Sequence, residues 1–121
     1  MKRQAYQMSL LLDFYGDLLT ERQQEFVDLY YNEDLSLSEI AENSGITRQG
    51  VRDVIVRAER TLTELEEKTG IVARFLQFQP HVTTIVNAAN EILEINHRAL
   101  GDDKIAALAE HILNAAQALR E

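Results

Sequence analysis

Four arginines lie close together in residues 43–60, a stretch with only two acidic side chains. They are Arg48, Arg52, Arg57 and Arg60, and the acids are Asp53 and Glu59. Guanidinium groups bind phosphates and pair with guanine edges, and a glutamine such as the neighbouring Gln49 can pair with adenine. The stretch has a net charge of +2, with all four of its basic residues arginine, in a chain with a formal net charge of −8. It predicts local nucleic-acid binding, because the acidic surface as a whole lacks the charge that phosphate contacts require.

The other chemically capable side chains are scattered, and they predict no catalytic or metal site. The three histidines, His81, His97 and His111, have no metal-ligand spacing, and the chain contains no cysteine. The five glycines are single, so no phosphate-binding loop is present. The cluster Glu64, Glu66 and Glu67 is most simply a solvated helix face. We therefore expect no enzymatic activity and no cofactor.

The 121 residues suffice for one small domain, or for a compact domain with a helical appendage. The apolar run at residues 8–12 is too short for a signal peptide, and no stretch approaches the length of a membrane span. The expected protein is soluble and cytoplasmic, with no membrane partner.

The arginines require a helix to present them, and residues 36–60, SLSEIAENSGITRQGVRDVIVRAER, have the layout of a helix-turn-helix. Ser36 and Glu39 form a capping box that begins a short helix, Gly45 closes it, and Thr47 caps the next. In that next helix, residues 48–68, apolar side chains recur at steps of four and three: Val51, Ile55, Ala58, Leu62 and Leu65. A helical corner carrying solvated arginines would show the same pattern, so the spacing alone leaves both interpretations open.

Helical periodicity continues on both sides of this motif. One stripe, Met8, Leu11, Leu12, Tyr15, Leu18 and Leu19, predicts a first helix, and Thr20 with Gln23 begins a second, with Phe26, Leu29 and Tyr30 inside. Beyond Gly70, Pro80 is expected in the first turn of a further helix, which places a hinge there. Two stripes then predict an antiparallel hairpin: Ile85, Ala88, Ala89, Ile92 and Ile95, and Ile105, Leu108, Ala109, Ile112, Ala116 and Leu119. The expected fold is all-α, with a helix-turn-helix domain at 1–78 and a C-terminal hairpin at 79–121.

Two resemblances sharpen this interpretation. Residues 36–62 resemble region four of sigma factors through Glu39, Ile40, Ala41, Gly45, Ile46, Thr47, Arg48, Val51 and Arg52. The longer segment LLDFYGDLLTERQQEFVDLYYNEDLSLSEIAENSGITRQGV resembles the YlxM family, and the likeness covers about residues 5–78. The family commonly has alanine where Gly50 stands. The resemblance implies a short, all-helical bacterial protein that binds DNA and takes part in the signal recognition particle pathway, since the family's genes typically neighbour those of the particle's GTPase and receptor.

The predicted function is that of a DNA-binding regulatory protein whose recognition helix, residues 48–60, enters a major groove. The candidate contact residues are Ser38, Thr47, Arg48, Gln49, Arg52, Asp53, Arg57 and Arg60. The alternative is an adaptor that binds the RNA or the GTPase of the signal recognition particle without binding DNA. A homodimer is expected in the first case, because helix-turn-helix proteins often span two half-sites, and the alanine-rich hairpin could serve either the chain's own core or a symmetric interface.

Overall fold

The computed structural model describes residues 5–120, which are almost entirely helical and contain no strand. The elements in chain order are α1 (Ala5–Tyr15), η1 (Gly16–Leu18), α2 (Glu21–Tyr31), α3 (Leu37–Ser44), α4 (Arg48–Thr69), α5 (Ile71–Ile95), η2 (Asn96–Leu100) and α6 (Asp103–Arg120). The chain divides into two compact units, Met1–Val72 and Ala73–Glu121. The all-α fold, the helix-turn-helix and the additional N-terminal helix are confirmed.

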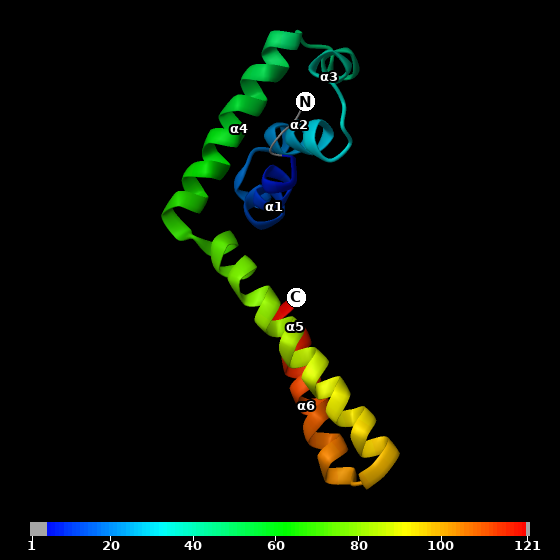
Figure 1. Cartoon of the computed structure of the whole chain (residues 1–121). Helices are drawn as coiled ribbons and strands as arrows, with labels where there is room; N and C mark the ends of the chain where they lie inside the picture. The colour runs from blue at the N-terminus through cyan, green and yellow to red at the C-terminus, as the bar shows by residue number, and fades with distance from the viewer. Residues whose placement is uncertain (1–4, 121) are drawn as a thin grey trace. The chain divides into compact units, whose positions relative to one another are not determined.

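In the first unit, α1, α2 and α3 pack along one side of the long helix α4 (Figure 1). One core cluster joins α1, the residue after η1, and α2 to the middle of α4, with one residue from the first turn of α5; it consists of Met8, Leu11, Leu12, Tyr15, Leu19, Val27, Ala58, Leu62 and Val72. A second cluster joins α2 and α3 to the start of α4 and consists of Phe26, Ile40, Ala41, Val51 and Ile55. The predicted stripe of α4 is therefore the axis of the core, because its buried side chains belong to both clusters.

The first helix is shorter than its apolar stripe predicts. α1 ends at Tyr15, and a single 3-10 turn follows before the Thr20 capping box starts α2. This turn directs Leu18 outward, with 68% of its surface exposed, whereas Leu19 enters the core. Leu18 was thus wrongly assigned to the inner face, because a 3-10 turn does not keep the helical period of 3.6 residues.

The end of α4 is joined to the start of α5 by one carboxylate. Gly70 ends α4 in the left-handed conformation, with φ of 63°, and α5 begins at the next residue. The Glu66 Oε1 atom accepts hydrogen bonds from the Val72 backbone N–H, at 3.0 Å, and from the Tyr15 hydroxyl, at 2.6 Å. Glu66 therefore caps the first turn of α5 and bonds to Tyr15 of α1 through the same oxygen, because a carboxylate satisfies N–H groups that a helix start leaves unpaired.

Pro80 does not begin a helix, contrary to the expectation from the sequence. It lies inside α5, which runs without interruption from Ile71 to Ile95. An internal proline costs a helix about 3 kcal/mol, because it removes one backbone hydrogen bond and crowds the preceding turn. The apolar spacing through Phe75, Phe78, Val82 and Ile85 nevertheless continues across it in steps of three and four. The helical period is therefore uninterrupted across Pro80.

The second unit is the expected helical hairpin, with α6 running back along α5 (Figure 1). A π-helical turn, η2, and Gly101, with φ of 58°, reverse the chain. The buried line between the helices is only partly the predicted one: Ala89, Ala109 and Ala116 were placed inside by the sequence pattern, whereas Val82 and Asn96, which are also buried, were not. Ile85, Ile92, Ile95, Leu108, Ile112 and Leu119, all placed inside by the sequence pattern, are between 42% and 69% exposed. The large side chains point away from the hairpin's interior.

Candidate nucleic-acid interface

Three capping residues set the ends of α3 and the start of α4: Ser36, Gly45 and Thr47. The Ser36 hydroxyl accepts from the Glu39 backbone N–H, and the Glu39 carboxylate accepts from the Ser36 N–H, which completes the predicted capping box. Gly45 ends α3 with φ of 71°, a left-handed conformation that glycine adopts without steric cost. Thr47 then caps α4, and its hydroxyl accepts from the Gly50 N–H at 2.9 Å. Local sequence therefore determines where the exposed helix begins.

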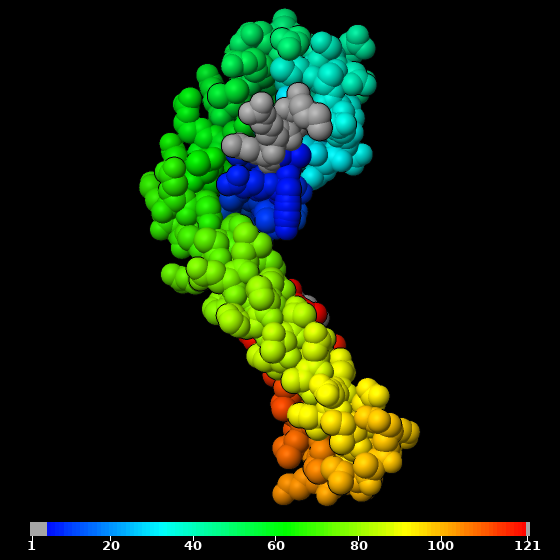
Figure 2. Space-filling view, in the orientation of Figure 1, coloured from blue at the N-terminus to red at the C-terminus, as the bar shows by residue number. Residues whose placement is uncertain are grey.

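The crossing of α3 over α4 is fixed from beneath by the second core cluster. Ile40 and Val51 are fully buried, and Ala41 and Ile55 complete the contact between the two helices. Ile46, in the turn, packs partly buried against the same cluster. The space-filling view shows α3, in cyan, packed against the first turns of α4, in green (Figure 2). This packing holds the first turns of α4 at the surface in one orientation.

All eight candidate contact residues are exposed, and they divide into three groups along α4 and α3. Gln49, Asp53, Arg57 and Arg60 lie opposite the buried stripe of α4, given about 100° of rotation per residue. Arg48 and Arg52 lie on the flank toward α2 and α3, since both line hollows with Tyr30 and Leu37. Ser38 is in the first turn of α3, and Thr47 is the cap of α4. The structure thus brings the four arginines to one helix but to two of its sides.

The carboxylates on α4 are held by neighbouring side chains rather than by the arginines. The Gln49 amide donates to Asp53 Oδ1 at 2.9 Å, and the Tyr31 hydroxyl donates to Glu59 Oε2 at 2.9 Å. Burial and the bond to Glu59 raise the pKa of the Tyr31 phenol, so it stays a donor. Within residues 5–120, Arg48 and Arg57 have no carboxylate at ion-pair distance, and the same holds for Arg52 and Arg60. Their guanidinium donors therefore remain open to a ligand.

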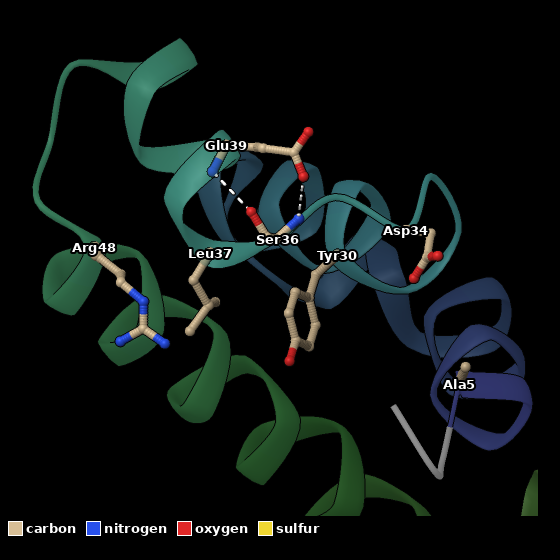
Figure 3. A pocket seen from close by; sticks show the side chains of 7 residues that line it. All are labelled: Ala5, Tyr30, Asp34, Ser36, Leu37, Glu39 and Arg48. Carbon is tan, nitrogen blue, oxygen red and sulfur yellow. Dashed lines mark hydrogen bonds between the residues drawn. The ribbon is translucent and has the colours of Figure 1, made fainter. Parts of the chain in front are cut away.

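A hollow of about 450 Å³ beside Arg48 was not anticipated from the sequence. Its lining is Ala5, Tyr30, Asp34, Ser36, Leu37, Glu39 and Arg48. The Arg48 guanidinium is directed toward Leu37 and Tyr30, and Asp34 lies beyond the tyrosine ring (Figure 3). Asp34, in the loop before Ser36, has φ of 57°, a left-handed conformation that aspartate and asparagine tolerate better than other non-glycine residues; no local sequence pattern indicated the hollow. The hollow adds carboxylates and an aromatic ring to the arginine side of α4.

The described residues provide neither a membrane-spanning helix nor a cluster of metal ligands. None of the helices in 5–120 combines the length and the apolar character that a bilayer span requires. In the same part of the chain, no three His, Cys, Asp or Glu side chains are grouped so that they could hold a metal ion.

The short helix, the glycine turn and the exposed helix that crosses it define a helix-turn-helix protein. A family model described as "Putative helix-turn-helix protein, YlxM / p13 like" matches residues 2–100, and the chain belongs to this family, UPF0122. The sequence resemblance is thereby confirmed, and it extends beyond residue 78 into the hairpin.

Similar proteins come from several bacteria. A UPF0122 protein of Desulforamulus reducens is 52% identical over 85 residues, which are 70% of this chain and 73% of that protein. A UPF0122 protein of Acetivibrio thermocellus is 46% identical over 106 residues, or 88% of this chain and 90% of the relative. A third, from Symbiobacterium thermophilum, is 51% identical over 71 residues, or 59% and 66% of the two chains. No solved structure matches the chain.

Proposed function

We propose that this chain is a DNA-binding regulatory protein that inserts the first turns of α4 into a major groove. The observation that carries the proposal is the row of exposed arginines, free of ion pairs among the described residues, on a helix-turn-helix whose core fixes its second helix. Arg48 and Gln49, in the first turn of α4, are the base-reading candidates, with Arg52 beside them. Arg57, one turn further, is placed for a phosphate, as is Arg60.

The remaining candidates have supporting roles. The Thr47 hydroxyl already accepts from Gly50, so it can still donate to a phosphate oxygen, and Ser38 offers a second hydroxyl from α3. Asp53 holds Gln49 in the free protein. A glutamine that pairs with adenine has to leave this hydrogen bond, so Asp53 tunes the reading of bases without contacting phosphate.

A titration of labelled duplex DNA, followed by fluorescence anisotropy at several salt concentrations, tests the proposal. Each lost phosphate contact reduces the slope of log K against log salt by about 0.9, so Arg57→Ala should weaken binding and flatten this dependence by roughly that amount. Arg52→Ala should weaken binding to a selected sequence more than binding to random duplex. Arg74→Ala, which removes the same charge from an exposed position in α5, is the matched control. Unchanged affinity and slope in both α4 variants would refute the mapping.

A second candidate function is supported by the hollow next to Arg48. Two of its lining residues, Asp34 and Glu39, are acidic, and the chain's net charge is −8, so the approach of a DNA backbone on this flank meets like charge. We propose, as this alternative, an adaptor of the signal recognition particle pathway that binds the particle's RNA or GTPase through α4 and this flank. Pull-down of the purified GTPase and RNA, with the hydrolysis rate measured in parallel, tests it; no complex and an unchanged rate would exclude it.

Both functions act by binding alone. The family description names a helix-turn-helix protein and no enzymatic activity, in keeping with a regulatory role. We also propose that residues 1–78 and 79–121 act as separate domains, that the chain works as a homodimer, and that its place of action is the bacterial cytoplasm, where both candidate partners are found.

A further inference from the structure

The hairpin of α5 and α6 has small side chains inside and large ones outside. Its buried line is Val82, Ala89 and Asn96 on α5 and Ala109 and Ala116 on α6. Alanines contribute little apolar area, so the hairpin's own interior stabilises it weakly compared with cores made of leucine or isoleucine. The apolar area that could stabilise it further lies on the outside.

The register of the two helices is set at the turn. The Asn96 side chain is buried and makes two hydrogen bonds with Asp102: its amide donates to the Asp102 carbonyl, and its Oδ1 accepts from the Asp102 N–H, each at 2.9 Å. At the open end, the Arg120 guanidinium donates to the Thr83 hydroxyl at 2.8 Å. Polar contacts at both ends therefore fix which residues of α5 and α6 lie opposite each other.

Four of the exposed apolar side chains stand at one constant offset from the buried line. Each follows a buried residue by three positions: Ile85 after Val82, Ile92 after Ala89, Ile112 after Ala109 and Leu119 after Ala116. A step of three residues turns the side-chain direction by about 300°, so each of these side chains points about 60° to one side of the buried residue before it. In two antiparallel helices, equal offsets point to the same side of the plane that contains both helix axes. A hollow lined by Phe78 and Ile85 of α5 and Leu119 of α6 agrees with this geometry.

We call this side the apolar face and define it by its six large exposed residues: Phe78, Ile85, Ile92, Leu108, Ile112 and Leu119. The spacing of seven in Phe78, Ile85 and Ile92, and again between Ile112 and Leu119, is that of helices in bundles and coiled coils. By the same rotation Glu94 and Glu110 fall on the far side, and Glu91 lies on the outer edge of α5, about 100° from Ile92. The face is thus continuous and free of negative charge in a chain whose net charge is −8.

We infer that the apolar face binds the same face of a second copy, so that two hairpins form a four-helix bundle around a two-fold axis. The six side chains, which are 42% to 69% exposed, present roughly 550 Å² in all, near the upper limit for the largest apolar patch of a typical monomer. Pairing two such faces buries about 1,100 Å², which exceeds the ~1,000 Å² that a specific interface requires.

The chemistry of the hairpin favours a second copy over other occupants. Two rows of side chains with a seven-residue repeat are complementary to an identical pair of rows, as in an antiparallel bundle. A membrane surface is disfavoured, because the far side carries Glu94 and Glu110 and the outer edge of α5 carries Glu91, whereas helices that lie on anionic lipid carry lysine and arginine there. Like-charged copies can meet only where their acids are turned away, and the apolar face meets that condition.

This inference rests on the proposed function only in that a dimer would supply two copies of α4; the association itself is independent of what α4 binds. The test is the mass of the full chain by light scattering and sedimentation across the micromolar range, with no nucleic acid present. The wild type should have twice the 13.8 kDa of one chain. Ile85→Glu and Ile112→Glu should each shift the species to a single chain, because a carboxylate buried in an apolar interface costs several kcal/mol. Asn87→Glu, exposed on the other side of α5, should remain dimeric.

A second measurement covers the case in which the glutamate variants unfold the hairpin, which loss of helical circular dichroism would reveal. The chain has no cysteine, so Ile85→Cys introduces one unique thiol on the apolar face, and Asn87→Cys one on the far side. A short bis-maleimide should link two Ile85→Cys chains efficiently and two Asn87→Cys chains poorly. The inference is overturned if the wild type sediments as one chain across the micromolar range. It is also overturned if Ile85→Glu and Ile112→Glu both remain dimeric, or if Ile85→Cys and Asn87→Cys cross-link equally well. DNA binding plays no part in these readouts, so its failure would leave them unaffected.

Discussion

Replacing Gly50 by alanine should make the helix-turn-helix more stable, although the new methyl group meets a close neighbour. Gly50 is the third residue of α4, where a glycine costs about 0.5–1 kcal/mol relative to alanine through lost backbone freedom. A Cβ at this position would lie 3.1 Å from the Thr47 hydroxyl oxygen and 3.5 Å from Ile46 Cδ1. The sign of the effect depends on whether Thr47 can yield without losing its cap.

Two other helix caps in this chain indicate that Thr47 can move slightly and still accept its capping hydrogen bond. In α2 and α3 the third helical residue bears a side chain, Gln23 or Glu39, and the capping hydroxyl still accepts its backbone N–H at 3.1 Å. The corresponding distance from Gly50 N to the Thr47 oxygen is 2.9 Å, so a lengthening of a few tenths of an ångström reproduces the geometry of the other two caps. Such a change leaves the hydrogen bond in its normal range. We therefore expect a net gain of about 0.5–1 kcal/mol.

Thermal and urea unfolding followed by circular dichroism would measure this gain, which corresponds to a rise of roughly 2–8 °C in Tm for a unit of this size. The matched control is Gly45→Ala, in the turn. No atom lies within 4 Å of a Cβ at Gly45, but its φ of 71° strains any L-residue, so this variant should lose about 1 kcal/mol. A fall in Tm for Gly50→Ala would mean that the methyl group displaces the Thr47 cap, and the reasoning from the other two caps would be wrong.

Two further outcomes concern the core. Glu66→Leu should destabilise the first unit by roughly 1–3 kcal/mol, because one carboxylate oxygen serves both the Val72 N–H and the buried Tyr15 hydroxyl, whereas Glu66→Gln keeps an acceptor and should cost less in urea titrations. Burial and carboxylate partners raise the pKa of both Tyr15 and Tyr31, so the unfolded chain loses these protons first. The contribution of these tyrosines to the free energy of unfolding should therefore be constant below the usual tyrosine pKa near 10 and should fall above it. In Tyr31→Phe the free energy of unfolding should fall less steeply with pH above about 10 than in the wild type. An equal slope in that variant would contradict the assignment.

The first unit could be predicted closely because local and tertiary preferences agree there. The capping residues Thr20, Ser36 and Thr47 act through atoms three positions away, and Gly45 acts through its own φ, so short sequence patterns suffice to place these helix ends. The stripe of α4 was also found correctly, because helices cover it on one side only. The exposure of the arginines on α4 followed from the same stripe.

The hairpin was predicted less well, because periodicity identifies an apolar face without saying what covers it. Ala89, Ala109 and Ala116 were placed inside correctly, but Ile85 and Ile92, from the same predicted stripe as Ala89, are exposed, and Val82 is buried instead. Pro80 misled in a different way, since it lies inside α5 rather than at a helix start, and the apolar spacing continues across it. The hollow beside Arg48 depends on where α1 and α2 lie relative to α4, and no local pattern in the sequence carries that information.

Association of two copies through the apolar face would account both for the exposed side chains of the hairpin and for the low DNA affinity expected of a single α4. One copy of α4 offers four arginines, but Asp53 occupies its outer side and Gln49 is held by that carboxylate, so its affinity for duplex DNA should be low. If two copies associate through α5 and α6, the second contact with DNA becomes intramolecular, and the overall affinity rises without a stronger helix. In that case the acidic chain would avoid general binding to nucleic acid, because appreciable affinity would arise only where both copies of α4 find a site.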